Sequence, residues 1–519
     1  MSHVMAIDAG TGSIRAVIFT LDGQLVNIAQ RSWEHLPEPG VPGSMGFTTE
    51  TNYALMVECI QEALTTSGLN GTDIKAVSAS AMREGFVVLD EQGNEIWACA
   101  NVDSRATRQV EELFAQEGVV QDVYERSGQT PALAAQPRLL WLKEHKPEIY
   151  ARAATILMLS EWVLYRLSGV RAMEPSNGST SGMLSLETRD VDVHLAQRTG
   201  VRDDLIPPVC EPGTALGTVR ADVAEETGLS TATLVVVGGG DAQLAALGLG
   251  LVNAGEVLLT AGTFWQLNVN LGVPKADPNM KIRVNMAAVP GLWQAEAIAF
   301  HPGTAVRWFR DTFAAEEVRQ AHEQGRNPLD VLSEAAGTVG IGSDGVIPIF
   351  SDVMNYDRWT HASPSFLNLN LDGGPRLRAA MFRSLLENAA IVSDANLALV
   401  STFADVNPDI PVTFAGGAAN SPVWSQITAD VLGRELRIPA VTEATAQGTA
   451  ACAASAFLGG VTPAHLAAQW VQWSHTVQPD LNAHHEYQEV KDRWRTAYAP
   501  QLELAHAGIV APLWRAPGA

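Results

Sequence analysis

Two strand–turn–strand segments, one in each half of the chain, constrain the fold most strongly. The first, IDAGTGSIRAVIF, covers residues 7–19, where apolar and β-branched residues flank a Gly-Thr-Gly-Ser turn. The second, GEVLLTAGTFWQLNVN, covers residues 255–270 and turns in the same way at Gly262-Thr263. Two halves that each contain such a hairpin predict a duplicated α/β architecture, with residues 1–248 and 249–519 as its domains and a cleft between them.

The periodicity of the remaining segments supports an α/β fold. After the first hairpin, Asp22-Gly23 predicts a second tight turn and therefore a three-stranded antiparallel meander. The further expected strands cover residues 74–81, 87–89, 234–237 and 411–415. The expected helices cover residues 50–66, 105–117, 138–146, 160–167, 422–432 and 447–458.

The net charge argues against two classes of partner. The chain has 519 residues, and 34 Lys and Arg against 57 Asp and Glu give a net charge of −23. Nucleic acids and anionic membranes attract basic surfaces, so neither is an expected partner. The apolar run 242–254 is too short to span a bilayer, and no signal peptide is expected. Four scattered cysteines without a CxxC motif suit a reduced, cytoplasmic compartment.

The GTGS turn has two interpretations. It can be an ordinary hairpin turn, or its glycines can let backbone N–H groups, with the Thr11 and Ser13 hydroxyls, converge on a phosphate. It is neither a dinucleotide fingerprint, because Arg15 stands where a third glycine is needed, nor a P-loop, because it has no lysine. Asp8 would repel phosphates unless a cation lay between them. The phosphate interpretation therefore implies a divalent metal, and Mg²⁺ fits best.

Asp241 follows three consecutive glycines, 238–240, and precedes an apolar helix. It can be a helix N-cap, or a carboxylate at the mouth of the expected cleft, where the glycines allow close approach. Arg83-Glu84 follows the expected strand 74–81. The pair is either an exposed ion pair or, if the chain turns at Gly85, a ligand-binding pair at the carboxyl end of a strand.

Asp103, Arg105 and Arg108 lie just before an expected helix, where Asp103 is either a cap or part of a polyol site. No HExxH or Gly-x-Ser-x-Gly motif is present. Glycine and threonine turns, two well-placed aspartates and polar strand ends suit phosphoryl transfer, in which the protein positions groups and neutralises charge.

Together these motifs resemble the FGGY carbohydrate kinase family, in order and spacing, over almost the whole chain. The residues that carry the resemblance are IDAGTGSIR, MREG, GGGDAQ, AGTFW and GGAANSPVWSQITADVLG. The resemblance implies two ribonuclease H-like (actin-like ATPase) domains, with ATP, Mg²⁺ and a polyol or sugar meeting between them.

The resemblance also implies roles for individual residues. Arg83 and Glu84 match the sugar-binding pair, and Asp241 matches the catalytic base, which also faces Mg²⁺. The first phosphate loop and its metal-directed aspartate match Asp8, Thr11, Gly12, Ser13 and the following Arg15. The second phosphate turn matches Gly262 and Thr263, and the nucleotide-side loops match Gly303, Gly416, Gly417 and Asn420.

The chain departs from glycerol kinases in two places, and the second departure counts against glycerol as the substrate. Gly12 stands where glycerol kinases have a second threonine, and the expected alcohol-contacting aromatic residue is not obvious around residues 129–136. Within the family the chain is most similar to the autoinducer-2 kinases, on segments that include IWACANVDSRATR, RWFRDTF, PIFSDVMNYDRW, HASPSFLNL and LWRAPG. This resemblance implies phosphorylation of the C5 hydroxyl of linear 4,5-dihydroxy-2,3-pentanedione in the cytoplasm. The alternatives are a pentulose or other polyol kinase, and a non-catalytic actin-like nucleotide-binding protein.

Overall fold

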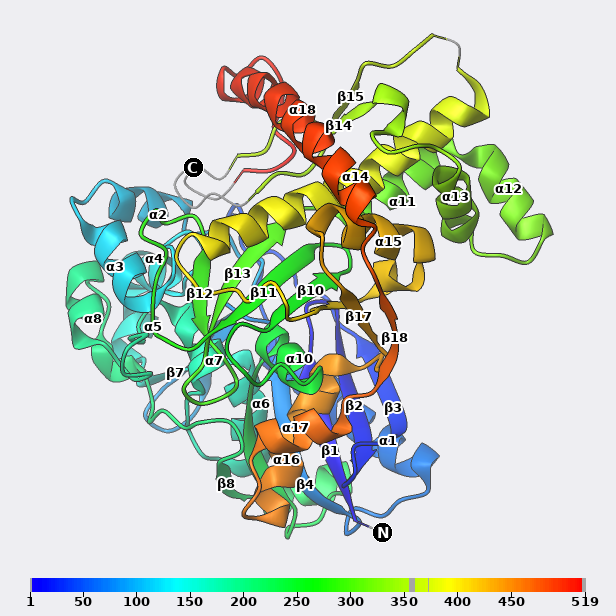
Figure 1. Ribbon diagram of the computed structural model, residues 1–519. Coiled ribbons are helices and arrows are strands. Elements are labelled where there is room, and N and C mark those ends of the chain that lie inside the picture. The colour runs from blue at the N-terminus through cyan, green and yellow to red at the C-terminus, as the bar shows by residue number, and fades with distance from the viewer. Residues whose placement is uncertain (1, 354–359, 372, 516–519) are drawn as a thin grey trace.

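The computed structural model describes residues 2–353, 360–371 and 373–515. Residues 354–359 of PIFSDVMNYDRW and the end of LWRAPG lie outside this part. The chain forms two large mixed sheets (Figure 1), which is the two-domain α/β class that the sequence predicts. Within the described residues, no helix is both long enough and apolar enough to cross a bilayer.

The first sheet has the strand order β3-β2-β1-β4-β9-β8. Its strands are β1 (His3–Ala9), β2 (Ser13–Thr20), β3 (Leu25–Ser32), β4 (Ile74–Ala81), β8 (Ala215–Thr218) and β9 (Leu234–Gly240). β1, β2 and β3 form the predicted antiparallel meander, while β4 runs parallel to β1 and β9 runs parallel to β4. β9 continues through all three glycines, so its predicted end at residue 237 was too early. A Cβ on Gly238 would lie 2.0 Å from the Ala79 carbonyl oxygen, so a glycine is needed in this strand.

The second sheet repeats this topology. Its order is β12-β13-β11-β10-β16-β17-β18, with β10 (Val257–Ala261), β11 (Trp265–Leu271), β12 (Arg283–Met286), β13 (Trp293–Ala299), β16 (Val412–Ala415), β17 (Leu436–Pro439) and β18 (Trp473–Val477). The antiparallel run β10, β11, β13 corresponds to β1, β2, β3, and β16 and β17 lie parallel beside β10 as β4 and β9 lie beside β1. The duplication predicted from the two hairpins is therefore confirmed.

Both faces of the first sheet are covered by helices. Along β1, Met5 and Ile7 pack in one core with α1 (Thr49–Ser67) and α6 (Leu159–Ser168). The alternating residues Val4 and Ala6 pack in another core with α16 (Ala444–Leu458) and α17 (Pro463–Trp470). Both helices come from the later half of the chain, yet α16 lies against β1, β4 and β9 of the first sheet, and α17 packs on α16 (Figure 1).

The remaining elements surround these sheets. Two small sheets contain β5 (Phe86–Leu89), β6 (Glu95–Cys99) and β7 (Thr155–Met158), and β14 (Ile347–Ile349) and β15 (Ser365–Leu367). Helices of the first half are α2 (Thr107–Phe114), α3 (Val119–Ser127), α4 (Gln136–His145), α5 (Pro147–Arg152), α7 (Pro175–Gly178), α8 (Val193–Thr199), α9 (Ala221–Thr227) and α10 (Asp241–Gly248). Those of the second half are α11 (Pro302–Phe313), α12 (Ala315–Glu323), α13 (Pro328–Gly337), α14 (Gly374–Ser401), α15 (Pro422–Leu432) and α18 (Leu481–His506).

Candidate active site

Three of the predicted site residues lie at the carboxyl ends of adjacent parallel strands in the first sheet. In the strand register Asp8 of β1 pairs with Ser80 of β4, and Ala81 of β4 pairs with Gly240 of β9. Asp8, Arg83 and Asp241 are therefore brought to one edge of the sheet, although they are far apart in sequence. This edge is where α/β proteins bind ligands.

Asp8 is buried and fully engaged. One of its oxygens accepts a hydrogen bond from Ser80 Oγ at 2.9 Å, and the other forms an ion pair with Arg15. Arg15 also contacts Glu443, at the start of α16, at 2.5 Å. In this arrangement Arg15 joins the first sheet to the later half of the chain.

The GTGS loop after β1 is held by side chains that the sequence interpretation missed. Trp33 Nε1 donates to the Gly10 carbonyl at 2.9 Å, and Asn101 Nδ2 donates to Thr11 Oγ1 at 3.0 Å. Thr11 and Gly12 themselves are exposed. The loop is thus anchored from behind while its tip is open to solvent, as a phosphate loop requires.

The second turn lies at the equivalent edge of the second sheet. Gly262 and Thr263 follow β10, and Gly416 follows the parallel neighbour β16. A Cβ on Gly303, at the start of α11, would lie 2.2 Å from the Gly262 carbonyl oxygen, and a Cβ on Gly416 would lie 2.6 Å from that of Ala261. Three backbone segments therefore approach closely at one point. Gly417 and Asn420 lie next to them as the exposed first and last residues of the 3₁₀ turn Gly417–Asn420.

A Gly303→Ala substitution tests whether this close approach matters. The added Cβ must displace the Gly262-Thr263 backbone, and misplacement of a catalytic element by about 1 Å costs about 100-fold in turnover. We expect a loss of that size, together with weaker ADP binding by calorimetry. Gly340→Ala is the matched control, because its Cβ meets nothing within 4 Å. Wild-type turnover in Gly303→Ala would contradict a role for this turn.

The Arg83-Glu84 loop turns at Glu84 and not, as expected, at Gly85. Glu84 has φ +66°, in the left-handed region that non-glycine residues seldom adopt. Gly85 is needed for packing instead, because its Cβ would lie 2.7 Å from Leu159 Cδ1 and 3.1 Å from the Asn101 backbone nitrogen. Strained backbone of this kind is common at functional sites.

Arg83 and Glu84 do not form an exposed ion pair. Arg83 is buried and makes two contacts with Glu296 of β13, Nη1 to Oε2 at 2.5 Å and Nη2 to Oε1 at 3.0 Å. Glu84 Oε1 accepts from Arg283 Nη1 of β12 at 2.7 Å. Arg283 and Glu296 are themselves cross-strand partners, with Nη1 and Oε1 3.8 Å apart. The four alternating charges connect the two halves of the chain.

Sequence reasoning missed Arg283 and Glu296. The available signal was a charged residue inside each of two otherwise apolar or uncharged strands, RVNM and WQAEAIA. Burial alone would raise the pKa of Glu296, but Arg83 and Arg283 outweigh it and lower that pKa. Glu296 is therefore an ionised carboxylate in a buried network.

Asp241 is the first residue of α10, whose N-cap is Gly240, so the cap interpretation of Asp241 was wrong. Burial raises the pKa of Asp241 to about 6, against the opposing effect of Arg83, and the negative charge of Asp8 adds to the rise. Arg83 Nε lies 3.7 Å from Asp241 Oδ1, and the Asp241 side chain keeps 39% exposure. Asp241 is thus an accessible carboxylate between a cation and a second carboxylate.

Asp103 is not a helix cap, since Ala106 is the N-cap of α2. Its carboxylate accepts from the Met45 backbone N–H at 2.6 Å and forms an ion pair with Arg105 at 2.8 Å. Arg108 forms exposed ion pairs with Glu112 and Glu144. The predicted polyol contact at Asp103 therefore competes with an ion pair that is already formed.

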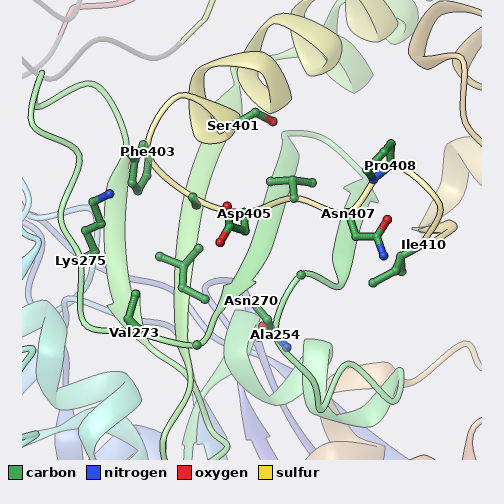
Figure 2. A pocket seen from close by; sticks show the side chains of 15 residues that line it. Ala254, Asn270, Val273, Lys275, Ser401, Phe403, Asp405, Asn407, Pro408 and Ile410 are labelled. Atoms are coloured by element: carbon green, nitrogen blue, oxygen red, sulfur yellow. The ribbon is translucent and has the colours of Figure 1, made fainter.

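A cavity of about 520 Å³ lies beside Arg83 and Glu84. Its wall comes from both halves of the chain and includes Asn101, Phe264 and Arg283. A larger hollow, about 890 Å³, is lined by residues such as Asn270, Lys275 and Asp405 (Figure 2). It lies at the amino ends of β10 and β16, opposite the Gly262 and Gly416 turns, and none of the predicted site residues lines it.

Fold and site together define a two-domain α/β protein with glycine-containing turns at corresponding edges of its two large sheets and two carboxylates, Asp8 and Asp241, at the first of these edges. Residues 3–248 match the model of the N-terminal domain of the FGGY family of carbohydrate kinases, and residues 259–457 match that of its C-terminal domain. This chain belongs to the FGGY family of carbohydrate kinases.

Individual relatives cover nearly the whole chain. The autoinducer-2 kinase of Yersinia enterocolitica is 48% identical over 99% of this chain and 98% of its own length. The autoinducer-2 kinase of Klebsiella pneumoniae is 47% identical over 100% of this chain and 98% of its own length. Among solved structures, the xylulose kinase of Rhodospirillum rubrum has a TM-score of 0.84 at 24% identity, covering 97% of this chain and 100% of its own. The ADP complex of Plasmodium falciparum glycerol kinase has a TM-score of 0.82 at 16% identity, covering 96% and 98%.

Proposed function

We propose that this chain transfers the γ-phosphoryl group of ATP to the C5 hydroxyl of linear 4,5-dihydroxy-2,3-pentanedione, the quorum-sensing signal autoinducer-2, in the cytoplasm. The observation that carries the proposal is the accessible Asp241 carboxylate beside Arg83 at the sheet edge. The near-full-length similarity to relatives named autoinducer-2 kinase supports this acceptor. Phosphorylation would make the signal an anion and so retain it in the cell.

Asp241 is the proposed base. It orients the attacking hydroxyl and accepts its proton, and with a pKa of about 6 most of this carboxylate is ionised at pH 7. A loose phosphoryl transition state depends more on orientation of the attacking hydroxyl and late acceptance of its proton than on deprotonation of that hydroxyl beforehand. Arg83 and Glu84 would hold the acceptor. The exposed Thr11–Ser13 loop and the Gly262-Thr263 turn would hold phosphates from the two sides.

The nucleotide would lie on the second half of the chain. Gly303, Gly416, Gly417 and Asn420 form the glycine-rich edge at the ends of β10 and β16, where a nucleotide can approach the backbone closely. This assignment agrees with the proposed division into residues 1–248 and 249–519. Helices α16 and α17 would belong to the second unit in sequence while packing on the first.

The residues at the first sheet edge fit a magnesium ion. Asp8 and Asp241 supply carboxylate oxygens, which Mg²⁺ prefers. The two residues are close enough to each other that the negative charge of Asp8 raises the pKa of Asp241. A cation between them would relieve this repulsion and that between carboxylate and phosphate. When bound, Mg²⁺ would neutralise charge on the transferring group. Because the two oxygens of Asp8 already contact Arg15 and Ser80, Asp241 is the carboxylate that is more accessible to a metal ion.

An acceptor panel tests the proposal. ADP release is followed with ATP, Mg²⁺ and, in turn, dihydroxypentanedione, xylulose, ribulose and glycerol. We expect kcat/KM for dihydroxypentanedione to exceed that of each alternative by about 100-fold or more, as for a site built to bind particular substrate oxygens. Preferred turnover of a pentulose would replace the proposed acceptor but keep the kinase. Acceptor-independent ATP hydrolysis alone would favour a nucleotide-gated binding protein.

A further inference from the structure

The second half of the chain contributes an arginine to the acceptor cavity. We propose that Arg283 is a specificity-determining residue. Its Nη2 donates a hydrogen bond to an oxygen of the substrate that is to be phosphorylated, and this oxygen is remote from the hydroxyl that reacts. The inference rests on the proposed function only in taking Asp241 as the position of the reacting hydroxyl. It adds a residue of β12 to the Arg83 and Glu84 contacts that the family resemblance implies.

One nitrogen of Arg283, Nη2, is an unused hydrogen-bond donor within the part of the chain that the structure describes. Arg283 is 1% exposed and lines the cavity of about 520 Å³. Its Nε donates to Gln129 Oε1 at 2.6 Å, and its Nη1 donates to Glu84 Oε1 at 2.7 Å. Nη2 is buried and has no hydrogen-bond partner among the described residues. An unsatisfied buried donor on a charged group is costly, so a partner from outside the chain is expected at this atom.

The guanidinium of Arg283 is held in place by its neighbours. Gln129 accepts from Arg283 and donates through Nε2 to Asn285 Oδ1 at 3.0 Å and to the Val284 carbonyl at 3.1 Å, so its amide orientation is fixed. Glu84 fixes the guanidinium from the other side. A donor that is already oriented binds its ligand at low entropic cost. Gln129 stands in the segment where an alcohol-contacting aromatic residue was expected, so this amide anchors the arginine instead.

Arg283 also lies at a suitable distance from the position of the reacting hydroxyl. Arg83 contacts Asp241 at 3.7 Å and Glu296 at 2.5 Å, and Glu296 lies 3.8 Å from Arg283. Arg283 is therefore displaced from Asp241 along the network of buried charges. An acceptor whose hydroxyl lies at Asp241 would direct its further oxygens toward Arg283. A guanidinium only donates, so it suits carbonyl oxygens, which only accept.

The test compares two acceptors in wild-type enzyme and in Arg283→Lys. One is dihydroxypentanedione and the other is pentane-1,2-diol, which keeps the terminal diol but lacks both carbonyl oxygens. In Arg283→Lys we expect KM for the dione to rise about 10- to 100-fold, the effect of one hydrogen bond to a charged group, with KM for ATP unchanged. The dione-to-diol ratio of kcat/KM should fall at least about tenfold.

Arg434→Lys is the matched control. Arg434 is also buried and also has an unpartnered nitrogen, Nε, but it donates to the Asn407 and Ile410 carbonyls away from the cavity. It should keep the wild-type ratio. If Arg283→Lys fails to fold, Gln129→Met, which removes the anchor, should lower the ratio in the same direction.

An unchanged dione-to-diol ratio in Arg283→Lys would overturn the proposal, and so would equal rises in KM for the dione and for ATP. If the wild-type enzyme prefers a pentulose, the ratio compared is instead kcat/KM for that pentulose over kcat/KM for its deoxy analogue. Failure of the proposed acceptor is thereby separated from failure of the Arg283 contact.

Discussion

Replacing Asp241 by asparagine is expected to lower acceptor-dependent turnover by about 100- to 10 000-fold, the range for loss of a general base. The amide keeps the shape of the side chain but cannot accept the proton of the attacking hydroxyl. Asp241 Oδ1 accepts a hydrogen bond from the Ala242 backbone N–H at 2.7 Å, and the side-chain oxygen of asparagine can accept the same bond, so its loss would not explain such a fall in turnover. ADP affinity, measured by calorimetry, should stay within a few fold of wild type.

Asp430→Asn provides the comparison. Burial also raises the pKa of Asp430, which lies in α15. Its carboxylate accepts hydrogen bonds from the Gln426 side chain and from the backbone N–H of Asp480, the N-cap of α18. Its substitution should leave turnover within about twofold, as for changes remote from the site. An Asp241→Asn enzyme that still phosphorylates the acceptor at the wild-type rate would refute Asp241 as the base.

Replacing Glu296 by glutamine should lower the free energy of unfolding by about 3 to 5 kcal/mol, the usual effect of removing one partner from a buried ion pair. Glu296 is 0% exposed and contacts Arg83 at 2.5 Å, so the variant leaves Arg83 and Arg283 as neighbouring buried cations. Urea unfolding followed by circular dichroism measures the change. KM for the acceptor should rise as well, because Arg83 loses its orienting partner.

The difference in free energy of unfolding between wild type and Glu296→Gln should depend on pH in a defined direction. The pKa of Glu296 is lower in the folded protein than in the unfolded chain, so its contribution is present above the ordinary glutamate pKa and is lost as the pH falls through the lowered value. The gap between wild type and Glu296→Gln should therefore narrow on acidification. The exposed pair Glu316 and Arg319 serves as control, and Glu316→Gln should be indistinguishable from wild type. Equal stability of Glu296→Gln and wild type at pH 7 would show that the network does not stabilise the fold.

Local sequence patterns predicted much of the fold. The alternation in IDAGTGSIRAVIF, together with the Asp22-Gly23 turn, gave the meander β1, β2 and β3, and the second hairpin gave the repeated topology. Strand ends also located Arg83 and Asp241, because residues that follow parallel strands meet at one edge of a sheet. These features depend on spacing within a few residues, which a single sequence contains.

Contacts between the halves could not be predicted in the same way. Nothing near Arg83 in the sequence indicates that Glu296 and Arg283 lie against it, since the pairing depends on how two sheets face each other. The packing of α16 on the first sheet is equally remote from local pattern. The turn at Glu84 was assigned to Gly85 because glycine is the usual left-handed residue, whereas here tertiary contacts impose that conformation on a glutamate.

The reaction proposed for this site is the transfer of a phosphoryl group from ATP to a terminal hydroxyl beside Asp241. It is tested most directly by supplying ATP labelled in the γ-phosphoryl group with dihydroxypentanedione and locating the label by ³¹P and ¹³C NMR. We predict a phosphomonoester on C5, formed about 100- to 10 000-fold more slowly in Asp241→Asn. Label recovered only as inorganic phosphate, at the same rate with and without acceptor, would contradict the account.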